Sequence, residues 1–225
     1  MIESGDKMKY WFFGASSEYA KYIIEDLESA GHEVIKFGRH NVDYTDPEGF
    51  IESIKDQALP DRVFFNANIR DADFEYSKKI IDQKDVYDTF IGSWKIGFWF
   101  KLVLLKYLEE RMKGVFIFST SSIAYDESTF PDTILYRILR GSEQQLIFTI
   151  GGKQKDLIVA GCCVSDMSLT TKQQYAKVVS THLLNDGFNG NHIWTVAGGT
   201  HMVKVEMDWQ RHAKFMDNGW DYTKL

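Results

Sequence analysis

The sequence has few cysteines and no excess of positive charge, and each shortage excludes a class of protein. Its only two cysteines, Cys162 and Cys163, are adjacent. Neighbouring side chains on a strand point to opposite faces, so a disulfide between them is not expected. Two buried thiols are typical of a reduced, cytoplasmic protein, and they are too few to hold a metal ion. With 26 Lys and Arg against 32 Asp and Glu, the net charge is −6, which argues against nucleic acid as a partner.

Long hydrophobic runs are also missing. The longest apolar stretch, around Ile96–Leu105, contains Lys101 and is flanked by two further lysines, so we expect no membrane-spanning helix. The segment Met1–Lys7 lacks the basic start and apolar run of a signal peptide. With only 3 prolines, 17 glycines and 44% hydrophobic residues, the chain is neither collagen-like nor disordered. Its 225 residues predict one globular domain over residues 1–225.

Short apolar runs, many of them aromatic, alternate with helical patterns. Strands are predicted at 8–13, 34–37, 62–65, 115–118, 156–163 and 192–196. Helices are predicted at 19–27, from 46 onward, and at 86–108, 134–150 and 171–186. Strands separated by helices indicate right-handed βαβ units. The fold class is therefore α/β: a single-domain, Rossmann-like, doubly wound parallel sheet with helices on both faces.

Ligands of such sheets bind at the carboxyl ends of the strands, so the residues that follow each strand are the candidates for a site. Glycine or polar residues follow several of them. These segments are Gly14-Ala15-Ser16-Ser17, Gly38-Arg39-His40 with Asp43, Asn66-Ala67-Asn68, Ser119-Thr120-Ser121-Ser122, and Val196-Ala197-Gly198-Gly199. Tyr136 follows Ser122 by fourteen positions, and Arg140 lies one helical turn beyond Tyr136. A turn that starts with glycine and leads into a helix favours binding of a pyrophosphate, through backbone N–H groups and the helix dipole.

In order and along nearly the whole chain, these segments resemble the motifs of the short-chain dehydrogenase/reductase family. Those motifs run T-G-x-x-x-G-x-G, D-V-T-D, N-N-A-G, S-S-x-A, Y-x-x-x-K and V-D-G-G. The resemblance implies a bound nicotinamide dinucleotide, held by Gly14, Ser16, Ser17, Arg39, Asp43, Asn66, Ala67 and Arg140. Arg39 stands where related reductases pair with the ribose 2′-phosphate, so NADP is the expected cofactor and NAD the alternative. Asp43 would accept a hydrogen bond from the adenine amino group, or would only cap its loop.

The resemblance also implies a catalytic group of Ser122, Tyr136 and Arg140. The tyrosine hydroxyl would exchange a proton with the oxygen of a small-molecule substrate while hydride moves to or from nicotinamide. Ser122 would polarise that oxygen. Arg140 replaces the family lysine and would supply the cation that lowers the pKa of the tyrosine, which is ~10 in the free side chain. Unlike lysine, arginine cannot relay a proton.

Several positions depart from the family pattern and leave two functions open. Glu18 and Ala20 replace two glycines of the first motif, Trp94 aligns with a catalytic asparagine, and the Pro-Gly after the predicted strand 156–163 is missing. The first function is an NADP-dependent oxidoreductase that acts on a carbonyl or hydroxyl group. The second is a non-catalytic protein of the same fold with a nucleotide-sensing or interaction role. A metal-dependent hydrolase is disfavoured because no His/Asp cluster follows the strands.

Aromatic residues outside the predicted strands point to self-association. They gather on the long helix at 86–108 and in the C-terminal tail at 200–225. The tail is predicted to pack on its own domain or on a second subunit. The family resemblance implies a homodimer or homotetramer.

Overall fold

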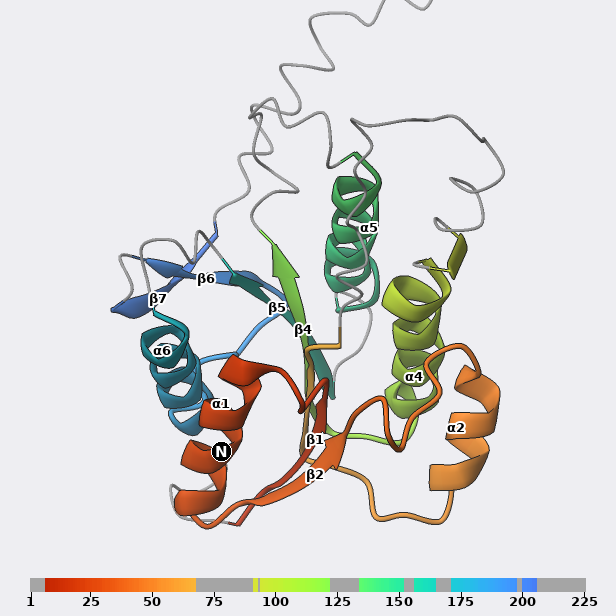
Figure 1. Cartoon of the computed structure of the whole chain (residues 1–225), viewed down its shortest axis with the longest axis horizontal. Coiled ribbons are helices and arrows are strands. Elements are labelled where there is room, and N and C mark those ends of the chain that lie inside the picture. Colours follow the sequence, from red (N-terminus) through yellow and green to blue (C-terminus); the bar gives the residue numbers. More distant parts are fainter. Residues whose placement is uncertain are drawn as a thin grey trace, which may run out of the picture.

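One seven-stranded sheet organises the chain. The computed structural model describes residues 7–67, 91–92, 94–121, 134–151, 156–164, 171–197 and 200–205. The sheet has the order β2-β1-β3-β4-β5-β6-β7 (Figure 1). Its strands are β1 (Lys9–Phe13), β2 (Glu33–Phe37), β3 (Arg62–Phe65), β4 (Gly114–Ser121), β5 (Leu157–Val164), β6 (Ile193–Ala197) and β7 (His201–Lys204). The first six strands pair in parallel, as predicted, whereas β7 pairs antiparallel with β6.

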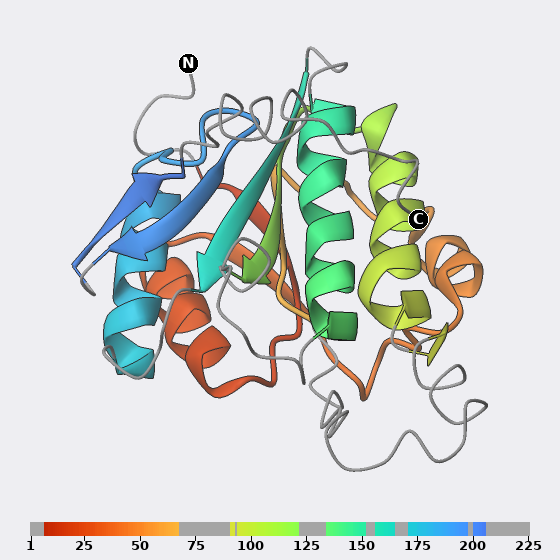
Figure 2. The same cartoon turned by 90° about the horizontal axis from the view of Figure 1, so that it is seen from above.

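Helices cover both faces of the sheet, which confirms the doubly wound arrangement. They are α1 (Glu18–Ser29), α2 (Pro47–Ile54), the π-helical turn η1 (Lys95–Trp99), α4 (Phe100–Glu109), α5 (Ile134–Gly151) and α6 (Lys172–Leu184). Helices α1 and α6 lie side by side on one face, and α2, α4 and α5 lie on the other (Figures 1 and 2). The predicted long helix at 86–108 thus contains a π-helical turn, and its residues 86–90 lie outside the described part.

Local sequence signals set several helix ends. Asp46 caps α2 by accepting a hydrogen bond from the Gly49 backbone N–H, and Pro47 is the first helical residue. Gly31 ends α1 with a φ of +90°, a conformation that glycine adopts without a steric penalty. Thr171 and Gln174 form a capping box at the start of α6.

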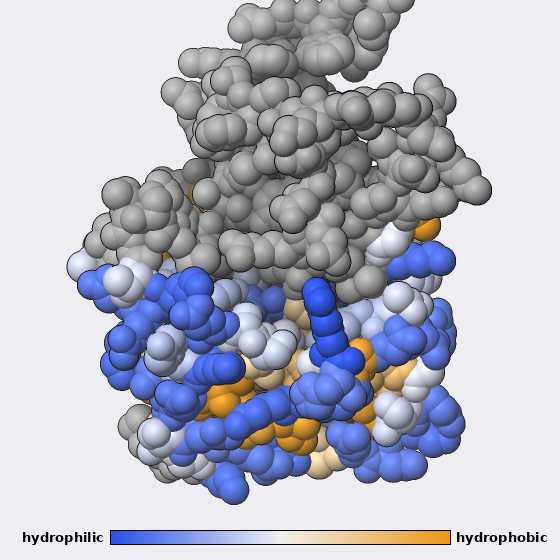
Figure 3. Space-filling model, viewed as in Figure 1, coloured by the Kyte–Doolittle hydropathy of each residue, from blue (hydrophilic) through white to orange (hydrophobic). Residues whose placement is uncertain are grey.

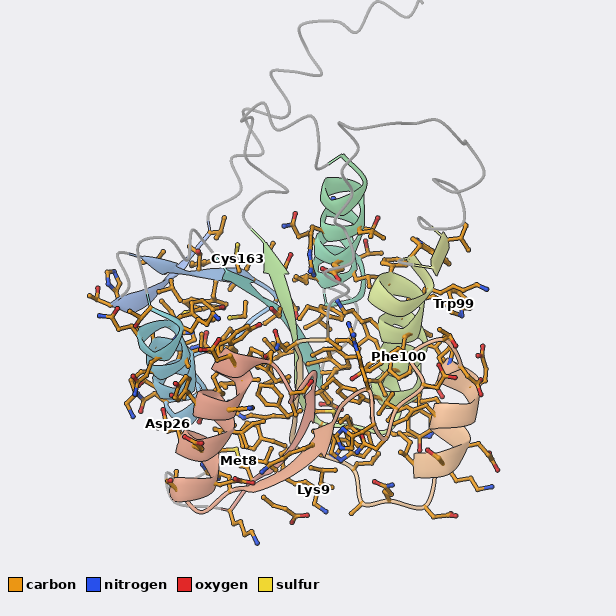
Figure 4. The ribbon with its side chains drawn as sticks, in the orientation of Figure 1. Met8, Lys9, Asp26, Trp99, Phe100 and Cys163 are labelled. Carbon is orange, nitrogen blue, oxygen red and sulfur yellow. The ribbon has the colours of Figure 1, made fainter. Side chains whose placement is uncertain are left out.

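The aromatic residues of β1 alternate between two cores. Trp11 and Phe13 belong to the cluster under α2, α4 and α5, whereas Tyr10 and Phe12 belong to the cluster under α1 and α6. All four are fully buried, as expected for a strand that is covered on both faces. On α4, Phe100 points into the first core, and the neighbouring Trp99 points outward and is 37% exposed (Figure 4).

The two cysteines form no disulfide and are buried, one in each core, which confirms that neighbouring strand residues face opposite ways. Most strands match their predicted ranges to within one residue at each end, but the end of β4 and the whole of β7 do not. Strand β4 continues to Ser121 because it pairs with β5 as far as Val164. Strand β7 was not predicted. It forms from the first residues of the tail, which pair with β6, while residues 206–225 lie outside the described part.

The β2 edge of the sheet carries charge. Glu33 and Lys36 are exposed there, and each is ion-paired, to Lys9 at 3.4 Å and to Glu28 at 2.7 Å. The described surface on this side is mostly hydrophilic, with smaller hydrophobic areas between (Figure 3). Charged side chains on an edge strand disfavour pairing with another chain.

Candidate functional site

The strand order reverses at β1, which lies between β2 and β3, and two predicted motifs meet there. Gly14 follows β1, while Asn66 and Ala67 follow β3. Gly14 has a φ of +75°, and a Cβ at this position would lie 2.6 Å from the Ala67 nitrogen and 2.8 Å from the Asn66 carbonyl carbon. Only glycine allows this approach. Ligands of such sheets bind outside the carboxyl ends of the strands at this switch point, and we call this place beside Gly14, Asn66 and Ala67 the crevice.

The Asn66 side chain ties this crevice together. It is 5% exposed, its Oδ1 accepts a hydrogen bond from the Tyr19 hydroxyl, and its Nδ2 donates to the Ser17 Oγ at 2.9 Å. The Tyr19 oxygen also lies 3.4 Å from the Ser119 Oγ on β4. Asn66 therefore joins the glycine turn, the start of α1 and the end of β4. Its side chain fixes the loop, a role that the motif alone did not indicate.

The turn at 14–17 presents the start of α1 to the crevice. The backbone N–H groups of Gly14 and Ala15 donate to the Phe37 carbonyl at 2.8 and 3.2 Å, which anchors the turn to β2. Ser17 is the N-cap residue, but its hydroxyl meets Asn66 and does not cap the helix. Ser16 is exposed. The first N–H groups of α1 thus have no cap from the Ser17 side chain, an arrangement that suits an anionic group.

Glu18, which replaces a family glycine, is paired with a lysine from another helix. Its carboxylate forms an ion pair with the Lys172 ammonium at the start of α6. The side chains of Lys172 and Glu18 are 49% and 62% exposed. The ion pair joins the N-terminal ends of α1 and α6 beside the turn. Sequence reasoning noted Glu18 but missed Lys172, because nothing local links residues so far apart along the chain.

Arg39 is exposed and lies in the turn that directly follows β2. Asn41 shapes that turn by accepting from the Gly38 backbone N–H at 2.7 Å and donating to the Lys36 carbonyl at 3.0 Å. Burial raises the pKa of Tyr44 to about 12, and the positive charge of Arg39 opposes this rise. The Tyr44 hydroxyl lies 3.5 Å from the Phe37 carbonyl, beside the glycine turn.

Asp43 is held by its own loop. Its carboxylate accepts hydrogen bonds from the Thr45 hydroxyl at 2.6 Å and the Thr45 N–H at 2.8 Å. These bonds lower the pKa of Asp43, because they favour its charged form. The loop-capping role considered for Asp43 is thus present, and its exposed carboxylate retains acceptor capacity.

Arg140 lies on the far side of the crevice, buried at 5% exposure. Its Nη1 donates to the Ser119 carbonyl at 3.2 Å and pairs with Glu143 at 2.7 Å. The other Glu143 oxygen pairs with Lys101 of α4, which is fully buried. Burial lowers the pKa of Lys101 to about 8, while the carboxylate of Glu143 opposes that effect. Ser119 links this side of the crevice to Tyr19.

Two of the three predicted catalytic side chains fall outside the described part of the chain. Ser122 lies directly beyond the end of β4. Residue 136 lies in the first turn of α5, four positions before Arg140, and the described part does not include its side chain. The structure brings together Gly14, Ser17, Asn66 and Ala67. It does not test the grouping of Ser122 with Tyr136.

Sequence reasoning missed four polar residues near the site: Tyr19, Lys101, Glu143 and Lys172. Lys101 left the clearest signal, as a lysine within an apolar run. Among the described residues there is no group of three or more potential metal ligands. In the same part of the chain, no helix combines the length and apolar character needed to cross a membrane.

No family model and no curated protein matches the sequence, but many solved structures match the fold. One is a small-chain dehydrogenase in complex with NADPH, 14% identical, with a TM-score of 0.67 over 86% of this chain and 98% of that chain. A short chain dehydrogenase family protein from Francisella tularensis is 16% identical, with a TM-score of 0.65 over 86% and 98%. A gluconate 5-dehydrogenase from Burkholderia cenocepacia, solved with NADP and tartrate, is 11% identical, with a TM-score of 0.62 over 86% and 95%. At these identities the likeness concerns the fold.

Proposed function

We propose that this chain, which has the fold of the short-chain dehydrogenases, is an NADP-dependent oxidoreductase that acts on a carbonyl or hydroxyl group of a small molecule. The approach of Gly14 to the Asn66–Ala67 backbone at the switch point carries the proposal. Gly14 has a conformation there that only glycine tolerates. It lies beside the start of α1, whose N–H groups receive no hydrogen bond from the Ser17 side chain. Both features suit a pyrophosphate.

The described residues fit a dinucleotide along the carboxyl edge of the sheet. The backbone N–H groups at the start of α1, which directly follow Gly14, Ser16 and Ser17, would hold the pyrophosphate, since those of Gly14 and Ala15 donate to the Phe37 carbonyl. The exposed guanidinium of Arg39 would pair with the 2′-phosphate of NADP, and Asp43 would contact the adenine. Asn66 and Ala67 would form the wall of the crevice, and Arg140 would face the nicotinamide ribose.

Nicotinamide supplies or accepts the hydride when it is bound. Tyr136 would exchange a proton with the substrate oxygen, and Ser122 would donate a hydrogen bond to that oxygen. The positive charge of Arg140, one helical turn from position 136, would favour the ionised form of the tyrosine. Arg140 keeps its own proton throughout.

A non-catalytic, nucleotide-sensing role is the second candidate. The observation in its favour is that Arg140 is already paired with Glu143 and bonded to the Ser119 carbonyl, so part of its charge is compensated. For either function we propose a cytoplasmic homodimer or homotetramer. Trp99 is exposed on η1, and its ring stacks on that of Trp94 with centroids 5.8 Å apart. An exposed tryptophan that stacks on a half-buried one suits a subunit contact.

Binding of NADPH and of NADH, followed by the fluorescence of the bound nicotinamide, tests the proposal. We expect saturable binding of NADPH and a weaker affinity for NADH. Arg39→Ala should weaken NADPH binding about tenfold or more, because a charge-assisted hydrogen bond contributes about 1.5–3 kcal/mol, and should leave NADH binding unchanged. Lys36→Ala is the matched control, since it removes a nearby exposed cation that is paired with Glu28.

Absence of saturable binding with either nucleotide at millimolar concentration would overturn the proposal. Turnover separates the two candidate functions. With a panel of aldehydes and ketones, the oxidoreductase should consume NADPH, and Tyr136→Phe should abolish that consumption while retaining NADPH affinity. A chain that binds NADPH but consumes it with no substrate on the panel has the sensing role instead.

A further inference from the structure

Helices α1 and α6 begin with the same kind of residue, but only α6 is capped by it. Ser17 precedes α1 with a φ of −70° and a ψ of 148°, and Thr171 precedes α6 with a φ of −64° and a ψ of 150°. Hydroxyl side chains are preferred at this position because they can accept from the first N–H groups of the helix. The Thr171 Oγ1 accepts from the Gln174 N–H at 3.2 Å, whereas the Ser17 side chain makes no such bond. Backbone conformation therefore does not explain why Ser17 leaves α1 uncapped.

The side chain of Asn66 holds the Ser17 hydroxyl instead. Its Nδ2 donates to the Ser17 Oγ at 2.9 Å. Asn66 is 5% exposed and directly follows β3, where its backbone N–H donates to the Phe13 carbonyl of β1 at 2.9 Å. Ser17 is therefore hydrogen-bonded to the end of a neighbouring strand and not to its own helix.

Contacts on two sides fix the orientation of the Asn66 amide. The Tyr19 hydroxyl donates to its Oδ1, and its Nδ2 also lies 3.5 Å from the Gly14 carbonyl oxygen, a group that can only accept. Turning the amide over would place two acceptors against each other at Gly14. The amide nitrogen therefore faces Ser17, and the Ser17 oxygen is the acceptor in this contact.

The contact with Asn66 decides what the Ser17 hydroxyl can still do. A hydroxyl group has acceptor lone pairs and one proton to donate. Because Asn66 donates to the oxygen, the Ser17 proton points elsewhere, and no group in the described part of the chain accepts it. The first N–H groups of α1 lie beside it without a cap from Ser17, and the Glu18 carboxylate in the same turn pairs with Lys172. Hydroxyl and helix start thus present donors to the crevice, which suit an anionic group.

We propose, on the basis of the oxidoreductase function above, that Asn66 is a positioning residue for the cofactor phosphates. Asn66 keeps the Ser17 hydroxyl away from α1, so that this hydroxyl and the first N–H groups of the helix all remain donors to the pyrophosphate of NADPH. Tyr19 assists by fixing the Asn66 amide. Asn66 does not touch the phosphates in this scheme and acts on them through Ser17.

Amide hydrogen exchange followed by NMR, without nucleotide, tests whether Asn66 prevents the cap. In Asn66→Ala the Ser17 side chain can turn to α1, and exchange of the Ala20 N–H, three residues after Ser17, should become several-fold slower. Ser17→Ala in that background should reverse the change. In the parent, Ser17→Ala should not slow the exchange of Ala20. A purely structural loss would make exchange faster, because it favours local opening.

NADPH binding by the same four chains tests the consequence for the cofactor. In the parent, Ser17→Ala removes a donor to a phosphate and should weaken binding about tenfold, as expected for a charge-assisted hydrogen bond. Asn66→Ala should also weaken it, because Ser17 then occupies a helix N–H group. Ser17→Ala in that background releases the N–H group and should strengthen binding several-fold. The fluorescence of the bound nicotinamide gives the four affinities of this double-mutant cycle.

A second variant and a control complete the design. If Asn66→Ala does not fold, Asn66→Asp keeps the shape of the side chain. Its carboxylate can only accept, so Ser17 donates to it, the Ser17 oxygen is left to accept from α1, and exchange of Ala20 should again slow down. Asn191→Ala is the matched control, because the Asn191 Oδ1 accepts from the Val159 N–H of β5 at 2.8 Å but lies before β6, at the opposite edge of the sheet. It should change neither the exchange of Ala20 nor the NADPH affinity.

Exchange of Ala20 that is unchanged or faster in both Asn66→Ala and Asn66→Asp would overturn the proposal, as would a loss of NADPH affinity from Ser17→Ala in both backgrounds. The exchange measurement needs no nucleotide, so its result is separate from the test of the oxidoreductase function. A chain that binds and uses NADPH but lacks the reversal refutes the positioning role alone. A chain that has the exchange pattern but binds neither NADPH nor NADH refutes the oxidoreductase function and, with it, the role of Asn66 in binding.

Discussion

At the scale of single residues, two glycines with positive φ have different tasks. Gly31 ends α1 with a φ of +90°, and a Cβ there would meet nothing within 4 Å. Gly14 has a φ of +75°, and its missing Cβ leaves room for the backbone of Ala67. Conformational strain is therefore the only penalty for a side chain at position 31, while position 14 would add a clash with backbone that cannot swing away.

Gly31→Ala and Gly14→Ala measure this difference. Gly31→Ala should lower the free energy of unfolding by about 1–2 kcal/mol, the usual penalty of a left-handed conformation. Gly14→Ala should lower it by about 3 kcal/mol or more, because the contact of 2.6 Å with the Ala67 nitrogen forces β1 and β3 apart at their ends. Urea unfolding of both variants and the parent provides the measurement. Equal losses would show that the close approach is not as tight as the structure has it.

At the scale of elements, sequence signals within one segment were sufficient to predict where an element begins, whereas structure that depends on pairing between segments could not be predicted. The start of α2 was placed correctly at Asp46, because capping depends on residues a few positions apart. The extension of β4 through Ser119 and Thr120 was missed, since polar residues there read as a loop until β5 supplies hydrogen bonds. Strand β7 was missed for the same reason, because it exists only by pairing with β6.

The ion pair between Glu18 and Lys172 gives a prediction about α1 and α6. Both side chains are about half exposed, so removing the pair should change the free energy of unfolding by at most about 1 kcal/mol. Its effect on NADPH binding should be larger and of opposite sign in the two variants. Glu18→Gln should tighten NADPH binding several-fold, because Lys172 becomes available to the phosphates. Lys172→Gln should weaken it several-fold, because an unpaired carboxylate then lies beside them.

Fluorescence titration with NADPH in low salt measures both effects, and added salt should reduce them. Asp26 and Lys177 provide the control, since they form an ion pair between the same two helices at 3.3 Å, away from the helix starts. Asp26→Asn and Lys177→Gln should leave the NADPH affinity unchanged. Shifts of the same direction in Glu18→Gln and Lys172→Gln would show that the pair acts through the packing of the two helices and not through charge.

At the scale of the whole molecule, the order of motifs along the chain predicted where the crevice lies, because the βαβ topology brings strand ends to one edge. Gly14, Asn66 and Ala67 could be assigned to it from sequence. Their side-chain partners could not. The bond from Tyr19 to Asn66 and the pairing of Lys101 with Glu143 join elements whose contacts depend on helix packing, and Tyr19 and Glu143 alone read as ordinary helical residues.

Lys101 also links the charge of the core to the stability of the whole chain. Its pKa is about 8 in the folded protein and 10.5 as an unperturbed side chain. Between these pH values the unfolded chain binds more protons at this residue than the folded chain does. The contribution of Lys101 to the free energy of unfolding is therefore constant below its folded pKa and increases as the pH rises from about 8 toward 10.5.

Other buried groups change stability in the opposite direction, so Lys101→Met is needed to isolate this contribution. Burial raises the pKa of Cys162 from 9.0 to about 12, so the unfolded chain loses the thiol proton first and stability falls as the pH rises above 9.0. The parent and Lys101→Met share this loss. Urea unfolding of both chains from neutral pH to pH 10.5 should therefore give a difference, parent minus variant, that becomes more positive above pH 8. A constant difference would mean that the folded protein holds Lys101 at its ordinary pKa, and a decreasing one would mean that Glu143 stabilises the ammonium more than burial destabilises it.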